Sequence, residues 1–188
     1  CPEGERGCVD SPSTEPDGAE QQGAVTAEQR SVDKQVKLAS DSGRLSDGTR
    51  LNLSGSKEQG FSASATGTKS AELSNQRCVT CSDGTQRTSA SFDASKLGPS
   101  ESGGHSHDST VKPLPGPEDG LMARVTGKTA YALSERGAFA IEKTDAGYRI
   151  RTVDGAMPSR TERREMQRTI DGWNQNQGGS GISCTSGC

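Results

Sequence analysis

Aromatic side chains and long apolar runs are both scarce in this chain. Only 3% of its 188 residues are aromatic and 28% are hydrophobic. No apolar run approaches the ~20 residues that a membrane helix needs, so no transmembrane segment is predicted. Because little apolar surface is available for burial, only part of the chain is expected to be ordered. We predict a disordered leader at 1–24, one folded domain at 25–174 and a flexible tail of Gly, Ser and Cys at 175–188.

The chain also lacks a strong charge of either sign. Lys and Arg number 22 against 25 Asp and Glu, which gives a formal net charge of −3. Such a balance attracts neither nucleic acid nor an anionic membrane surface, and no nucleic-acid partner is predicted. No secretory signal peptide is predicted within the sequence. Since it begins with Cys1 rather than Met, we expect a processed or excised piece.

The cysteines fall in three close pairs at the beginning, middle and end of the chain. They are Cys1 and Cys8, Cys78 and Cys81, and Cys184 and Cys188. An even number in close pairs is typical of disulfides in an oxidising compartment, although their connectivity does not follow from sequence. Two alternatives stay open. The middle and last pairs together would supply four thiolates for a zinc site. The polar stretch after Cys1 resembles the lipid-anchored start of a mature bacterial lipoprotein.

Helical and strand-like patterns follow one another along the chain. A capping box at 26–29 predicts a helix that ends near Gly43 with Val32, Val36 and Ala39 on one side. A second capping box, at 159–162, opens a last helix with Met166, Ile170 and Trp173 in a stripe that faces the core. The other expected elements are strands at 51–53, 61–65, 88–97, 129–133, 138–141 and 148–153, a helix at 118–125, a turn-rich segment at 74–87 and a loop at 98–104. This order predicts an α+β fold, with a small mixed or antiparallel sheet flanked by helices.

The two histidines of the chain are one residue apart, at His105 and His107. On an extended strand, both side chains point to the same face. Two imidazoles on one face, joined by a carboxylate from the next element, are suited to a divalent transition metal such as zinc. Asp119 stands at the start of the next predicted helix and can supply that carboxylate.

Hydrolysis at a metal also needs a carboxylate that takes a proton from water. Glu58, at the start of a predicted strand, is the preferred base, and Glu72 is the alternative. With Glu58, His105, His107 and Asp119 in this order, the chain resembles the JAB/MPN metallopeptidases, also called JAMM, from about Thr26 to Trp173. The resemblance implies a sheet flanked by helices, of the cytidine-deaminase-like kind. It also implies that His105, His107 and Asp119 are zinc ligands and that Glu58 is the general base.

The resemblance is greatest to a bacterial branch found in polymorphic toxins and secretion-system proteins. That branch has a glycine before the first histidine, here Gly104, and a strand pair with a Tyr-x-x-Ser-x-x-Gly pattern. Here the pattern falls on Tyr131, Ser134 and Gly137. The branch suggests an effector or toxin domain that acts on a protein or peptide, with an immunity or secretion partner. The expected location is secreted, periplasmic or at the cell envelope, or the cytoplasm of a target cell for an effector.

The chain departs from the family pattern at two places. The spacing from His107 to Asp119 is one residue longer than usual, so Glu118 competes with Asp119 as the third ligand. The family serine that helps to stabilise the oxyanion is replaced by Gly116, and loss of one oxyanion donor costs ~10²–10³ in rate. A backbone N–H or Ser109 is the expected substitute. Two further hypotheses follow: a weakly active or inactive member of the fold that binds a partner, and an envelope protein stabilised by disulfides.

Overall fold

The computed structural model describes residues 25–54, 57–80, 86–107, 114–145 and 147–176, with the backbone alone at 75–80, 86–91, 117–118 and 169–176. Its fold is α+β, as predicted. The helices are α1 (Ala27–Ser42), the 3-10 turn η1 (Ala94–Lys96), α2 (Pro117–Thr126) and α3 (Arg160–Asn176). The strands are β1 (Gly60–Ser64), β2 (Gly67–Ala71), β3 (Leu73–Thr80), β4 (Gln86–Phe92), β5 (Ser102–Ser106), β6 (Ala130–Ser134), β7 (Gly137–Thr144) and β8 (Gly147–Gly155).

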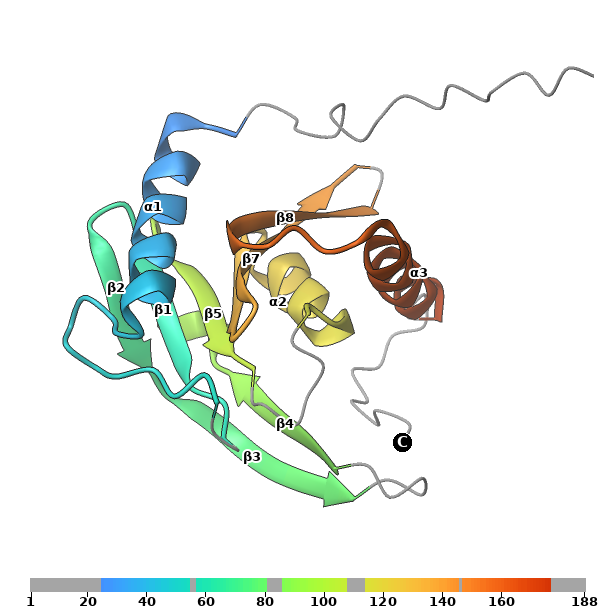
Figure 1. Cartoon of the computed structure of the whole chain (residues 1–188), viewed down its shortest axis with the longest axis horizontal. Coiled ribbons are helices and arrows are strands. Elements are labelled where there is room, and N and C mark those ends of the chain that lie inside the picture. The colour runs from blue at the N-terminus through green and yellow to red at the C-terminus, as the bar shows by residue number, and fades with distance from the viewer. Residues whose placement is uncertain (1–24, 55–56, 81–85, 108–113, 146, 177–188) are drawn as a thin grey trace, which may run out of the picture.

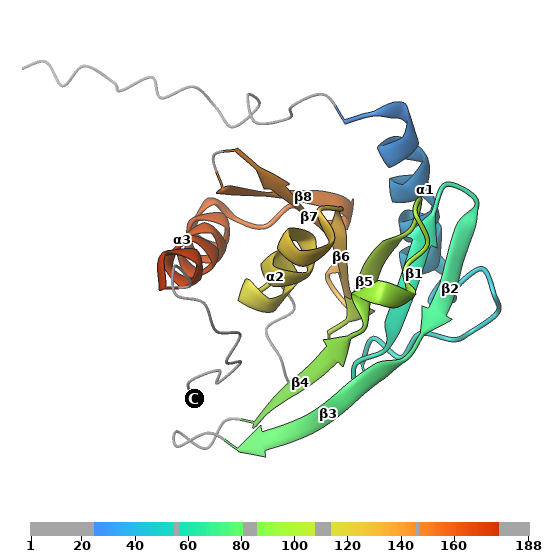
Figure 2. The same ribbon diagram turned by 180° about the vertical axis from the view of Figure 1, so that it is seen from behind.

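Six of the strands form one mixed sheet in the order β2-β1-β5-β6-β7-β8. Only the β5–β6 pair in this sheet is parallel, and the other neighbours are antiparallel. Figure 1 shows α1 on one side of the sheet and α2 with α3 on the other. Two separate apolar clusters agree with this layering, one around Phe61 and Leu133 beneath α1 and one around Ala123 and Ile141 beneath α2. The β3–β4 hairpin forms a sheet of its own, which extends below the larger sheet in both views (Figure 2).

Helix α1 begins and ends where the sequence predicts. The Thr26 hydroxyl accepts a hydrogen bond from the Gln29 backbone N–H at 3.1 Å. Gly43 ends the helix with φ at 61°, a left-handed conformation that costs glycine little. The predicted face of Val32, Val36 and Ala39 is buried. The Gln29 side chain does not complete the capping box, because it donates to the Tyr131 hydroxyl on β6 and so ties α1 to the sheet.

The second half of the chain follows its predicted pattern closely. The three predicted strands are β6, β7 and β8, and the short helix ends at Gly127 as expected. The capping box of α3 is reciprocal: Ser159 N–H donates to Glu162, and Glu162 N–H donates to the Ser159 hydroxyl. Met166 is buried as predicted, while the side chains of Ile170 and Trp173 lie outside the described part. No helix in the described ranges is long and apolar enough to cross a membrane.

The first half of the chain contains the errors. The predicted strand at 51–53 is a loop, because Leu51 N–H donates to the Gly43 carbonyl at the end of α1 rather than to a neighbouring strand. Strand β2 was not predicted, since its Ser, Thr and Lys side chains show no apolar alternation. The segment expected to be turn-rich at 74–87 belongs largely to the β3–β4 hairpin. The strand predicted at 88–97 ends at Phe92 and is followed by η1.

The loop predicted at 98–104 is also shorter than expected, because β5 begins at Ser102. Packing against β1 requires a glycine at position 104 of this strand, because a Cβ there would lie 2.4 Å from Cζ of Phe61 on β1. The Phe61 ring, which is fully buried, occupies the space that a side chain at 104 would need. The glycine before the histidines therefore serves close packing of β1 against β5.

Gly104→Ala is expected to lower the free energy of unfolding by about 1–3 kcal/mol, the usual cost of overpacking a core. Urea denaturation measures this change. Gly98→Ala is the matched control, because a Cβ at 98 meets only the flexible Glu101 side chain, at 3.3 Å. Equal stability of the two variants would contradict the packing role of Gly104.

Candidate metal centre

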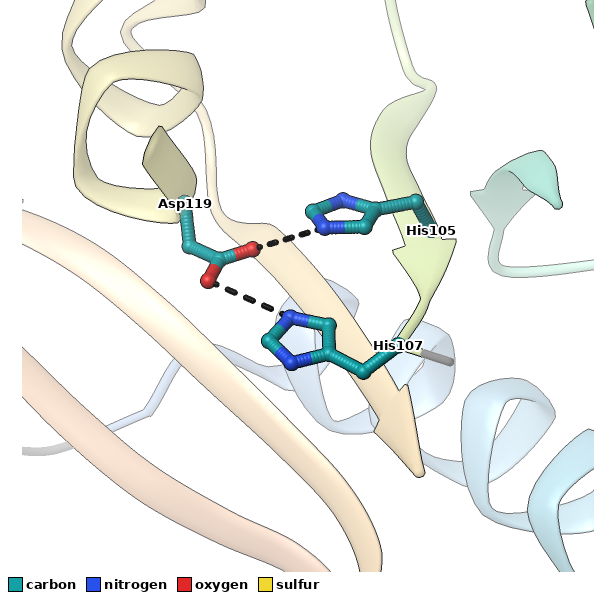
Figure 3. A group of neighbouring side chains, drawn as sticks. All are labelled: His105, His107 and Asp119. Atoms are coloured by element: carbon teal, nitrogen blue, oxygen red, sulfur yellow. Dashed lines mark ion pairs between the residues drawn. The ribbon is translucent and has the colours of Figure 1, made fainter. Parts of the chain in front are cut away.

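Strand β5 carries the two histidines on the face of the sheet that α2 covers. His105 lies opposite Gly60 on β1 and beside Ala132 on β6. Ala132 belongs to the apolar cluster beneath α2, which identifies this face. His107 follows directly after β5, and its backbone N–H donates to the Leu133 carbonyl on β6 at 2.7 Å. The alternation predicted from the sequence therefore holds, with both imidazoles projecting from one strand end toward the helix (Figure 3).

The third member of the group comes from the first turn of α2. This helix connects two parallel neighbours, β5 and β6, so its N-terminus returns to the end of β5 where the histidines lie. Asp119 is the third residue of the helix, and its Oδ2 accepts the Gly116 backbone N–H at 2.7 Å. Gly116 is the N-cap and has no side chain to return a hydrogen bond. Half of a capping box therefore orients the Asp119 carboxylate toward the sheet.

The three side chains converge in a buried place (Figure 3). Nε2 of His105 lies 3.3 Å from Oδ1 of Asp119, and Nε2 of His107 lies 3.4 Å from Oδ2. One potential ligand atom from each residue lies within 4.8 Å of the other two. The side chains of His105, His107 and Asp119 are only 12%, 6% and 3% exposed. The two rings are stacked with centroids 5.0 Å apart, so neither imidazole blocks the other from the carboxylate.

The electrostatics of this group favour a cation. Burial lowers the pKa of His105 and the neighbouring His107 lowers it further, whereas the Asp119 charge opposes the change. Burial alone would raise the pKa of Asp119, but the two histidines and the Gly116 N–H together lower it to about 2. Oδ1 of Asp119 is buried and accepts no hydrogen bond from any described residue. A charged carboxylate whose second oxygen accepts no hydrogen bond, and which faces imidazole nitrogen atoms, is suited to binding a divalent metal.

Glu58 is not a member of this group. It is partly buried and directly precedes Gln59, whose backbone pairs with Ser106. Continuing the register of Gly60 opposite His105 places Glu58 opposite His107, on the same face. Among the described acidic, histidine and cysteine side chains, only Asp119 shares ligand distance with the two histidines. Glu58 is therefore not a member of the group of three, and the extended register is what relates it to His107.

The other candidates either lie outside the group or have side chains that the structure does not describe. The Glu72 side chain is 81% exposed and pairs with Lys96 at 3.7 Å, between β2 and β3. For Glu118 the structure gives the backbone alone, and Ser109 lies outside the described residues. The same is true of the cysteines: Cys78 lies on β3 with only its backbone described, and Cys1, Cys8, Cys81, Cys184 and Cys188 lie outside the described ranges. The disulfide and second zinc predictions therefore stay predictions.

Sequence reasoning missed two residues that shape the site. The Ser106 hydroxyl accepts the Gln59 backbone N–H at 2.9 Å and so links the two strands beside Glu58 and His107. Neither residue carries a sequence signal for this, because the link depends on how β1 and β5 pair.

No protein-family model, no curated protein and no solved structure matches the chain. The His105, His107 and Asp119 group is therefore the observation from which a function is inferred.

Proposed function

We propose that this protein is a zinc-dependent hydrolase of the JAB/MPN metallopeptidase type, which cleaves a peptide or isopeptide bond. One observation carries the proposal: two histidines from one strand and a buried aspartate from the next helix form a three-ligand group. Three protein ligands with a fourth position left for water are typical of catalytic zinc, whereas structural zinc sites are closed by four ligands. The donor set of two imidazoles and one carboxylate also suits iron(II), so the metal itself has to be measured.

In the proposed reaction, separate residues bind the metal, transfer the proton and orient the ligands. His105, His107 and Asp119 would hold the metal, which when bound supplies a polarising charge for the scissile carbonyl and an acidified water molecule. Glu58 takes the proton of the attacking water and passes it to the leaving amine. The Gly116 N–H keeps Asp119 oriented. Burial of the group excludes bulk water, which strengthens these charge interactions.

Metal analysis of the purified chain tests the proposal. After dialysis against zinc and iron(II) in turn, the chain should retain about one equivalent of zinc that His107→Ala does not retain, because two ligands cannot replace three. Since the cysteines are a second potential zinc site, the decisive quantity is the difference between the two proteins. Identical zinc contents would exclude His107 as a ligand and with it the proposed reaction.

A second candidate is a domain of the same type that binds metal and a partner but turns over slowly. The N-cap favours it, because Gly116 stands where the resembled family has an oxyanion-stabilising serine. Its φ of −118° and ψ of −174° are accessible to serine. Gly116→Ser should therefore raise turnover of a peptide substrate by ~10²–10³ if the missing hydroxyl limits the rate. An unchanged rate with an active parent would show that another donor already serves the oxyanion.

A further inference from the structure

Ser106 stands between the two histidines in sequence but projects to the opposite face of β5. Successive side chains of a strand alternate, so this hydroxyl does not share the face of His105 and His107. Its side chain is fully buried, with 0% of the residue exposed. The hydroxyl reaches sideways to β1, where it accepts the backbone N–H of Gln59 at 2.9 Å.

This bond replaces one half of a regular strand pair. In an antiparallel ladder, the opposed residues of every second pair exchange two hydrogen bonds, each N–H donating to the C=O of the other residue. Ser106 N–H does donate to the Gln59 carbonyl at 2.9 Å, but Gln59 N–H bonds to the Ser106 hydroxyl. The hydroxyl thus extends the pairing of β1 and β5 one step beyond Gly60 and His105, their last regular pair at this end. A partly buried N–H needs such a partner, because leaving it unpaired is costly.

The side chain of Gln59 is held as firmly as its backbone. Its Oε1 accepts the Asn52 backbone N–H at 2.6 Å, and its Nε2 donates to the Arg50 carbonyl at 3.1 Å. Gln59 is therefore fixed between the loop after α1 and strand β5. Because Glu58 directly precedes Gln59, these contacts also restrict the position of the Glu58 backbone. Continued for one residue, the register puts Glu58 opposite His107 on the ligand face.

We infer that Ser106 is a positioning residue: its buried hydroxyl, acting through the backbone of Gln59, holds residue 58 beside the histidine pair. The inference rests on the proposed function, since a metal held by His105 and His107 is what gives Glu58 its role. Ser106 itself contacts neither the metal nor the substrate. Its contribution is to set the distance between the base on β1 and the ligands on β5.

A zinc-affinity measurement tests this placement without any turnover. Glu58→His introduces a further imidazole at position 58 and should tighten zinc binding at least about tenfold, the scale on which a site's supporting residues act. Adding Ser106→Ala should abolish this gain, whereas adding Ser106→Thr, which keeps a hydroxyl, should retain it. Ser102→Ala is the matched control, because Ser102 lies on the same strand and face and is 7% exposed. It should leave the gain intact.

Two outcomes would overturn the inference. One is a gain that survives Ser106→Ala, and the other is a Glu58→His chain that binds zinc no more tightly than its parent. Should Ser106→Ala not fold, Ser106→Cys takes its place, because sulfur has a similar position but accepts hydrogen bonds weakly.

Turnover supplies a second readout that a merely structural role would not move. On a cleaved peptide, Ser106→Ala should lower kcat and leave KM unchanged, and Ser106→Thr should restore kcat. A chain that shows the affinity pattern but cleaves no peptide would contradict the proposed activity and leave the positioning role of Ser106 in place.

Discussion

Asp119→Asn is expected to weaken zinc binding by more than about 100-fold, the upper end of what loss of a supporting partner costs a metal site. The substitution keeps the size of the side chain and removes its charge. Asp119 is the one charged donor among the three, and its carboxylate faces Nε2 of both histidines. A neutral amide would present an oxygen with less charge, or an NH₂ group that no metal accepts. Competition with a chromophoric chelator measures the change in affinity.

Asp47→Asn is the matched control for this experiment. The pKa of Asp47 is also lowered to about 2, because its carboxylate accepts the backbone N–H groups of Ser70 and Thr49. Asp47 lies outside the metal-binding group. Its replacement removes a carboxylate with a similar backbone role and should leave zinc affinity unchanged. Equal losses in both variants would mean that Asp119 acts through folding and not as a ligand.

The grouping of His105, His107 and Asp119 could be predicted because it depends on local geometry. Alternation along a strand fixes the relation of His105 to His107 without any knowledge of the sheet. The position of Asp119 follows from helix N-terminal signals, namely Gly116 and Pro117 just before it. The remaining step, the return of the helix to the end of β5, needs only a strand, a helix and a parallel strand in succession.

The strand predicted at 61–65 is confirmed as β1, but its two neighbours in the sheet, β2 and β5, could not be predicted in the same way. Strand β2 and the start of β5 consist largely of Gly, Ser, Thr and Lys, so no apolar alternation marks them. Their cohesion comes from pairing with β1 and from close packing, such as the Phe61 ring against Gly104. Register is a property of two strands that are distant in sequence. For this reason the Ser106–Gln59 link and the place of Glu58 emerge only from the folded chain.

The choice between Glu58 and Glu72 shows the same limit. Both carboxylates precede or follow a β-like segment, and sequence alone leaves either as the base. Extending the register of β1 and β5 beyond Gly60 and His105 would set Glu58 opposite His107, whereas Glu72 is exposed and pairs with Lys96. The folded chain therefore distinguishes the two carboxylates by their burial and their neighbours, which the sequence does not reveal.

Glu58→Gln is expected to lower kcat for peptide hydrolysis by ~10²–10⁴, the usual contribution of a general base. Glutamine keeps the length of the side chain but cannot take a proton from water. Zinc affinity should stay within about twofold of the parent, because Glu58 is not part of the ligand group and supporting residues alone produce larger losses. The two measurements together separate a base from a ligand: a ligand variant loses affinity first, and a base variant loses rate alone.

Glu72→Gln is the matched control for Glu58→Gln. It makes the same chemical change at an exposed carboxylate whose described partner is Lys96, so both kcat and zinc affinity should equal those of the parent. A loss of rate in Glu72→Gln with full activity in Glu58→Gln would exchange the two roles and contradict the register-based placement of the base. Full activity in both variants would mean that neither carboxylate takes the proton, and that the metal-binding group works with a base from elsewhere in the chain.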